Sequence, residues 1–164
     1  MQEWRDRQGQ NASVMFNGVF FAAQAQSGRG LLHNDPQAFS RILPGNAEPE
    51  SIGSTLREAL SASRFLTAAE ARHFFSTAEA ASGQQFLQEL CAAAGVDSRA
   101  KLFKGMRLCH VALRGDTIKF GPTARVKREA WEGLGAESEM FCSSSASNQE
   151  IAGVLNAALA QCRG

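Results

Sequence analysis

The chain has 164 residues, of which 44% are hydrophobic, and these values predict a folded protein with one core. Its 17 Lys and Arg nearly balance 16 Asp and Glu, so the formal charge of +1 provides no overall steering and a charged partner must be met by a local patch. No apolar run is long enough to span a bilayer, no secretion signal opens the chain, and the four cysteines lie far apart, so we expect a soluble cytoplasmic protein with reduced thiols.

The first part of the chain predicts strands. Residues 1–12 are charged and rich in Gln, and we expect them to form a flexible N-terminus before a single domain that spans 13–164. The Val and Phe residues of "SVMFNGVFFAAQ" (13–24) predict one buried strand. Gly and Pro mark 25–36 as a loop, and the alternation in "AFSRIL" (38–43) predicts a second strand.

Two helices are expected next. The first runs from about 49 to 63, with Pro49 in its first turn, where a missing N–H costs nothing. The second is a long helix that opens with a capping box, in which Thr67 is the N-cap and Glu70 reaches back to it. Gly95 is the predicted C-cap of this helix.

The second half begins with a pattern of period two. Residues 108–122 form two β-rich runs around a Gly-Asp turn and predict a hairpin. The segment 128–134 is expected to form one or two helical turns, and 139–144 a short last strand. A second capping box, Ser147 to Glu150, opens the final helix.

The first and last of these helices repeat each other at an offset of 99 residues. The identical pairs are Ile52 and Ile151, Leu56 and Leu155, Ala59 and Ala158, Leu60 and Leu159, and Arg64 and Arg163. Their spacing is that of one apolar helix face, and each helix follows a short strand and a polar turn. We therefore predict an α/β (α+β) fold: one mixed or antiparallel sheet of about five strands, with two similar strand-turn-helix units packed on it.

Motifs that carry chemistry are missing from the sequence. It has no Gly-rich nucleotide loop, no zinc spacing and no Gly-x-Ser-x-Gly elbow. Cys109 and His110 are adjacent on a predicted strand, so they point to opposite faces and cannot act as a nucleophile and its base. His33 and His73 are isolated, which argues against a metal site. We therefore predict no catalytic residue, metal or cofactor, although an enzyme using Cys109 or a histidine stays an alternative.

Charge is distributed unevenly in the second half. Residues 99–128 contain nine Lys or Arg and a single acid, Asp116. The following segment, 129–139, contains no Lys or Arg. It contains Trp131 and four acidic residues: Glu129, Glu132, Glu137 and Glu139. The basic segment could contact phosphates, whereas the acidic one, with its aromatic residue, suits the docking of a basic protein.

Several of these pieces together resemble the immunity proteins of contact-dependent growth inhibition systems. The likeness rests on "KLFKGM" (101–106), on the hairpin with Gly115, on the run from Pro122 to Trp131, and on the final "SS…EI" helix. The helix "ESIGSTLREALSASRF" also resembles the N-terminal half of these proteins. The resemblance covers most of 38–163 and is looser over 1–37.

The resemblance implies a bacterial cytoplasmic protein that binds the C-terminal toxin domain of its own system as a one-to-one complex and blocks it. Many toxins of such systems are nucleases, often acting on transfer RNA, and a nuclease cleft is usually basic. The expected toxin contacts are therefore carboxylates with an aromatic anchor: Glu137, Glu139, Glu132, Glu129, Trp131 and Asp116. The loop 25–36 is a further candidate because it matches the family least well. A nucleic-acid-binding module that uses 99–128 is the alternative function.

Overall fold

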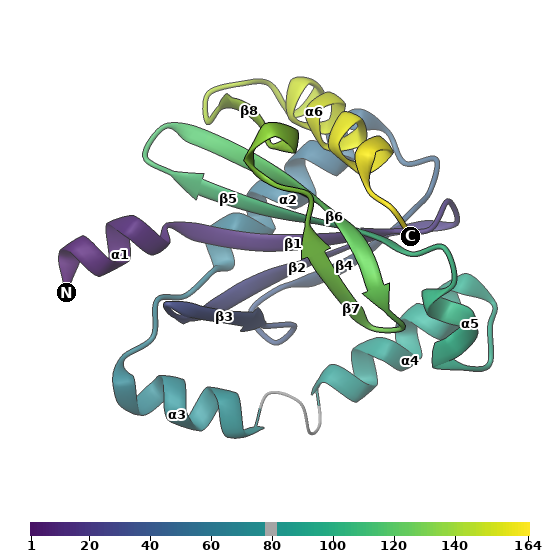
Figure 1. Cartoon of the computed structure of the whole chain (residues 1–164), viewed down its shortest axis with the longest axis horizontal. Helices are drawn as coiled ribbons and strands as arrows, with labels where there is room; N and C mark the ends of the chain where they lie inside the picture. Colours follow the sequence, from purple (N-terminus) through teal and green to yellow (C-terminus); the bar gives the residue numbers. More distant parts are fainter. Residues whose placement is uncertain (78–81) are drawn as a thin grey trace.

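The computed structural model describes residues 1–77 and 82–164. Within these residues, eight strands form one antiparallel sheet in the order β3-β2-β1-β5-β6-β7, with β4 added to β2 and β8 added to β6 (Figure 1). The strands are β1 (Gln10–Phe16), β2 (Phe20–Arg29), β3 (Leu31–Asn34), β4 (Ser40–Pro44), β5 (Arg107–Arg114), β6 (Thr117–Lys127), β7 (Ala130–Gly133) and β8 (Met140–Ser143). The sequence predicts about five strands, so the sheet is larger than expected.

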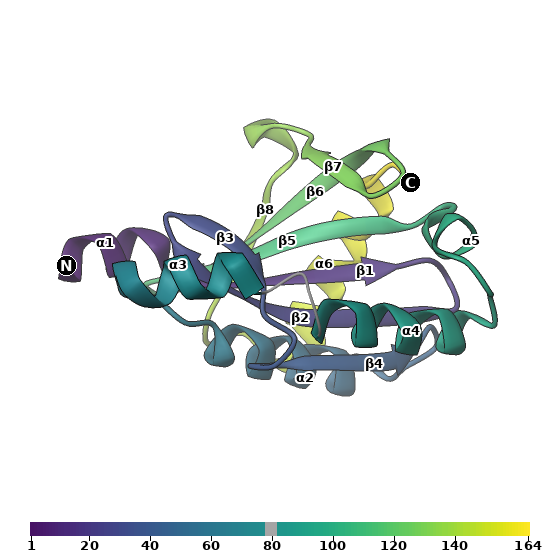
Figure 2. The ribbon, with the colours of Figure 1, turned by 90° about the horizontal axis from the view of Figure 1, so that it is seen from below.

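Helices cover both faces of this sheet. They are α1 (Gln2–Gln8), α2 (Pro49–Ala62), α3 (Ala68–Thr77), α4 (Ser82–Ala94), α5 (Arg99–Phe103) and α6 (Asn148–Gln161), with a short 3-10 helix, η1 (Ala136–Ser138). Figure 2 shows α3 and α4 in front of the curled sheet and α6 behind it. The sheet therefore forms a middle layer, with α2 and α6 against one face and α4 and α5 against the other.

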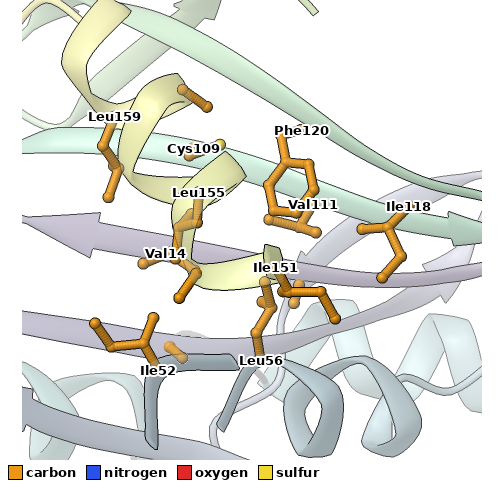
Figure 3. Packing of buried hydrophobic residues seen from close by; sticks show 14 of the residues in the cluster. Val14, Ile52, Leu56, Cys109, Val111, Ile118, Phe120, Ile151, Leu155 and Leu159 are labelled. Atoms are coloured by element: carbon orange, nitrogen blue, oxygen red, sulfur yellow. The ribbon is translucent and has the colours of Figure 1, made fainter. Parts of the chain in front are cut away.

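The main core lies between the sheet and the paired helices α2 and α6 (Figure 3). Alternate residues of the central strands point into it, as the two-residue period of a strand requires: Val14 on β1, Cys109 on β5 and Phe120 on β6 are at most 2% exposed. The repeated helix positions meet them, and Leu56 and Leu155 are each 1% exposed. The common spacing of the two helices therefore marks one shared core.

The repeat extends well beyond the two helices. β1 and β5 pair with each other at the centre of the sheet, and each is followed by a longer strand, β2 or β6. A short strand then pairs with that longer strand, β4 with β2 and β8 with β6, before α2 or α6 begins. After each helix the chain returns to the longer strand of its own unit and forms a parallel bridge with it. Phe65 pairs with Gly28 on β2, and Arg163 pairs with Ala124 on β6. The predicted pair of strand-turn-helix units is confirmed, and each unit is larger than expected.

Both predicted N-caps are found at helix starts, and the first forms a complete capping box. The N–H of Thr67 donates to the Glu70 carboxylate at 2.7 Å, and the N–H of Glu70 donates to Thr67 Oγ1 at 3.2 Å. Hydrogen bonds from the backbone and the side chain of Thr67 to the Glu70 carboxylate lower the pKa of Glu70. Ser147 accepts from the N–H of Glu150 at 3.1 Å. Gly95 follows α4 with φ 67°, as a C-cap does. The predicted continuity of the long helix across 78–81 lies outside the described residues.

Some expected segments differ from the structure. The segment 13–24 is not one strand, because the chain turns at Asn17, whose side chain accepts bonds from the N–H groups of Val19 and Phe20. The segment 128–134 contains strand β7 rather than helix, because it pairs with β6. Residues 1–12 hold α1 and the start of β1, where Ala12 is fully buried between its partners on β2 and β5.

Candidate binding cleft

The sheet face opposite α2 and α6 changes from apolar to polar side chains halfway along its strands. Met15 and its neighbours on β2 and β5 form an apolar row, which α4 and α5 cover. Two residues back along β1, Ser13 stands between Gln24 on β2 and His110 on β5. This second row is polar, so the sheet itself provides a boundary between a covered apolar half and an open polar half.

The open half is hollowed. Two adjoining hollows, of about 570 Å³ and about 340 Å³, are both bordered by Gln26 and His110, and we call them together the cleft. The larger hollow runs between the sheet and α4, where Phe86 and Leu87 form an apolar wall. The smaller hollow continues over β5 and β6 past Gly121. A space of this size suits a segment of another molecule.

Hydrogen bonds hold the polar side chains of the floor in place. Ser13 Oγ donates to Asn34 Oδ1 at 2.9 Å, and Gln26 Nε2 donates to the same oxygen at 3.2 Å. Ser13 is 1% exposed and Gln24 4% exposed. His110 is reached by solvent from the cleft, yet the surrounding protein removes enough water to lower its pKa, which favours the neutral imidazole at neutral pH.

Charged residues stand at the rim of the cleft in pairs. At the larger hollow, Arg99 donates two hydrogen bonds to Glu129. At the smaller hollow, Lys119 Nζ lies 3.0 Å from Glu139 Oε1. Trp131 borders the larger hollow, where its indole N–H donates to the Met106 carbonyl at 3.3 Å. Arg114 also borders the smaller hollow, so the cleft has an uncharged floor and a rim that carries two ion pairs and one further cation.

The structure brings three of the six predicted contact residues to this cleft: Glu129, Trp131 and Glu139. The other three are exposed elsewhere: Glu132 on β7, Glu137 in η1, and Asp116 in the turn between β5 and β6. The segment 25–36 is not a loop throughout, since it holds the end of β2 and all of β3; its residues Gln26, His33, Asn34 and Pro36 border the larger hollow.

Sequence reasoning missed the floor itself. Ser13, Gln24 and Gln26 fall in segments predicted as strand and loop, and only their positions on paired strands bring them together. One feature of the sequence could have indicated it: alternate residues, which share one face of a strand, change from apolar to polar. Phe20 and Ala22 are followed on the same face by Gln24 and Gln26.

The basic segment 99–128 does not form a free phosphate-binding surface along its length. Carboxylates pair with Arg99, Lys101, Lys119 and Arg128. Arg107 and Arg125 donate to backbone carbonyls. Six of its nine cations are thus engaged within the protein.

The candidate catalytic thiol has the environment of a core residue. Cys109 is fully buried, and this burial raises its pKa far above the ordinary value, which disfavours the reactive thiolate. Across the described residues, no group of three His, Cys, Asp or Glu side chains is placed to hold a metal ion. The helices described there are also too short or too polar to cross a membrane.

Comparison with known proteins gives consistent matches. The family described as CDI immunity protein (CdiI) matches residues 10–162. The immunity protein CdiI-YPIII of Yersinia pseudotuberculosis serotype O:3 (strain YPIII) is 26% identical over 168 residues, covering 93% of this chain and 95% of its own. A solved structure from Neisseria meningitidis, the protein of unknown function NMB0488, is 30% identical, with a TM-score of 0.87. The match covers 94% of this chain and 95% of that chain. A chain in the CdiA-CT/CdiI toxin and immunity complex from Yersinia pseudotuberculosis shares the fold, with 22% identity and a TM-score of 0.78. The match covers 94% of this chain and 97% of that chain.

Proposed function

This chain belongs to the CDI immunity protein family, and we propose that it binds the C-terminal toxin domain of its own system as a one-to-one complex and neutralises it. The solved Yersinia assembly of the same fold pairs a CdiI protein with a CdiA-CT toxin, which is the kind of partner proposed here. The chain acts as an inhibitor in the cytoplasm of the producing cell and not as an enzyme.

The observation that carries the proposal is the cleft. The larger hollow is big enough to receive part of a partner, and hydrogen bonds already hold the polar side chains that border it. An ordered, uncharged floor with paired charges at its rim resembles the centre and the polar edge of a protein interface. A toxin segment that enters the cleft would lose its surrounding water and gain hydrogen bonds from the amide side chains.

The toxin is proposed to be a nuclease, with transfer RNA as the first substrate to test, and its active site is occluded in the complex. The active site of a nuclease holds a polyanion, so its surroundings carry positive charge. Glu132, Glu137 and Asp116 are exposed carboxylates that suit such a surface and would speed association. Glu129 and Glu139 are partly neutralised by Arg99 and Lys119, and Trp131 is held by Met106, so these three would act at the rim of the cleft.

The first test is co-expression with the C-terminal domain of any large exported protein that is encoded directly upstream. We expect the two chains to purify together with a dissociation constant in the nanomolar range and cells that make the toxin to survive only when this chain is present. Transfer RNA from the rescued cells should stay intact. If no complex forms and no cell is rescued, the proposal is wrong, and the segment 99–128 should then be tested for RNA binding that weakens with salt.

A further inference from the structure

Gly121 lies in the middle of β6 with its missing side chain directed into the smaller hollow. Glycine weakens the interior of a strand, so its presence there calls for a physical reason. Three reasons are usual: a backbone with positive φ, a β-bulge, or a close approach by another part of the chain.

None of these reasons applies to Gly121. Its φ is not in the positive range, where seven other glycines of this chain are found. The irregularity of β6 lies between Arg125 and Lys127, whereas Gly121 pairs in regular register with His110. A Cβ added at Gly121 would lie 3.7 Å from the His110 carbonyl oxygen, which is an ordinary contact distance. The fold would therefore accept a side chain at this position.

The surroundings of Gly121 leave the same space open. Gly133 on β7 borders the same hollow, and a Cβ there would meet no described atom within 4 Å. The neighbouring floor residues, Ser13, Gln24 and His110, stand in one row with Gly121 across four strands and carry no formal charge when the imidazole is neutral. At the rim of this hollow Lys119 and Glu139 offset each other, and Arg114 is the remaining charged side chain.

We infer that Gly121 keeps the floor of the cleft bare so that an uncharged segment of the toxin can lie with its backbone directly on β6, beside His110. This inference rests on the proposed function and adds which part of the immunity protein touches the partner most closely, and with what chemistry. Amide and imidazole groups of the floor hydrogen-bond the segment, whereas a charged side chain in the cleft would lose its hydration without gaining a counter-ion.

The test compares Gly121→Leu with Gly153→Leu. Gly153 lies on the exposed face of α6, on the other side of the sheet, and a Cβ there also meets no described atom within 4 Å. Both variants add the same side chain, but only the first fills the cleft. Binding is measured by calorimetry with a catalytically inactive form of the toxin domain encoded upstream, and folding by the melting temperature.

We expect all three chains to fold, Gly153→Leu to bind like the parent, and Gly121→Leu to bind at least about 100-fold more weakly, because the added side chain occupies the partner's place. In the variant Asp116→Asn/Glu132→Gln/Glu137→Gln, which lacks the exposed carboxylates outside the cleft, the dissociation constant should change less than about tenfold between roughly 0.1 M and 1 M salt, because no charge is paired on the floor.

Folded Gly121→Leu that binds as tightly as the parent would overturn the inference. If Gly121→Leu does not fold, Gly121→Ala decides in its place, since its single methyl group has ordinary contacts; equal binding by that variant would overturn the inference as well. A steep loss of affinity with salt in the variant that lacks the Asp116, Glu132 and Glu137 carboxylates would overturn the uncharged character of the segment. A parent chain that binds no toxin would overturn the proposed function and this inference with it.

Discussion

Replacing Leu155 with alanine is expected to destabilise the protein strongly while leaving toxin recognition intact in the chains that remain folded. Leu155 belongs to the repeated face of α6, is 1% exposed, and points into the core between the helices and the sheet (Figure 3). The cleft lies on the opposite face of the sheet. The substitution therefore tests the stability of the core without changing the binding surface.

The magnitude depends on how Leu155 is packed. Truncation of a buried leucine removes its transfer free energy and leaves a cavity, which together cost about 2–5 kcal/mol. Leu155 is almost fully buried in one cluster with Leu56, Val14 and other residues of α2 and the sheet, so truncation removes a nearly complete set of apolar contacts. We expect the upper part of the range, about 3–5 kcal/mol.

Urea unfolding and thermal melting measure this loss. For a domain of this size, each kcal/mol lowers the melting temperature by about 2–4 °C, so Leu155→Ala should melt roughly 6 to 20 °C below the parent. The matched control is Leu31→Ala, because Leu31 is 72% exposed and its truncation should change the free energy of unfolding by less than about 0.5 kcal/mol. The double variant with Leu56→Ala should lose less than the sum of the two, because both side chains border one void.

A scaffold role for the repeated helices is refuted by one combination of results. If Leu155→Ala melts like the parent and yet no longer binds the toxin domain, Leu155 contributes to recognition and not to the core. A melting temperature that falls as expected, with binding retained below it, supports the separation of the two faces.

Three further predictions concern polar groups. Arg57→Leu should cost about 2–4 kcal/mol in urea unfolding, because the Arg57 guanidinium donates to carbonyls and to a side chain just before and at the start of α6. Asp35→Asn should cost about 1.5–3 kcal/mol, because Asp35 is buried and accepts two bonds from Arg64; unchanged stability would contradict this. Desolvation lowers the pKa of His110, so below about pH 6.5 the unfolded chain takes up a proton at this imidazole more readily than the folded chain does, and the free energy of unfolding falls. The decrease in melting temperature from about pH 7.5 to pH 5.5 should therefore be smaller in His110→Gln.

The helices can be predicted because their signals are local. A capping box spans four residues, and the bonds that Thr67 and Glu70 exchange need no other part of the chain. Strand boundaries are harder, although one local signal is present: Asn17-Gly18 is a typical hairpin turn, and it lies inside the run predicted as one strand. Buried residues on both sides of that turn make two paired strands look like one.

The contact residues are predicted from a run of charge, and such a run does not show which charges are already paired. Glu129 meets Arg99, which is 30 positions away, and Glu139 meets Lys119, which is 20 away. The floor of the cleft depends on even longer separations, since Ser13 stands beside His110 only because β1 pairs with β5. Pairing between distant strands is a property of the tertiary fold, so the cleft could not be located from the sequence.

The internal repeat explains where the cleft arises. The two units match closely on the face covered by α2 and α6, where a shared core requires the same residues in both. They differ after the repeated helix: the first unit continues through α3, α4 and α5 across the opposite face, whereas the second ends shortly after α6. One additional set of helices can cover only part of a sheet that two units have built. The remaining part stays open and polar, and it is there, where the two units cease to be equivalent, that the chain has room for a partner.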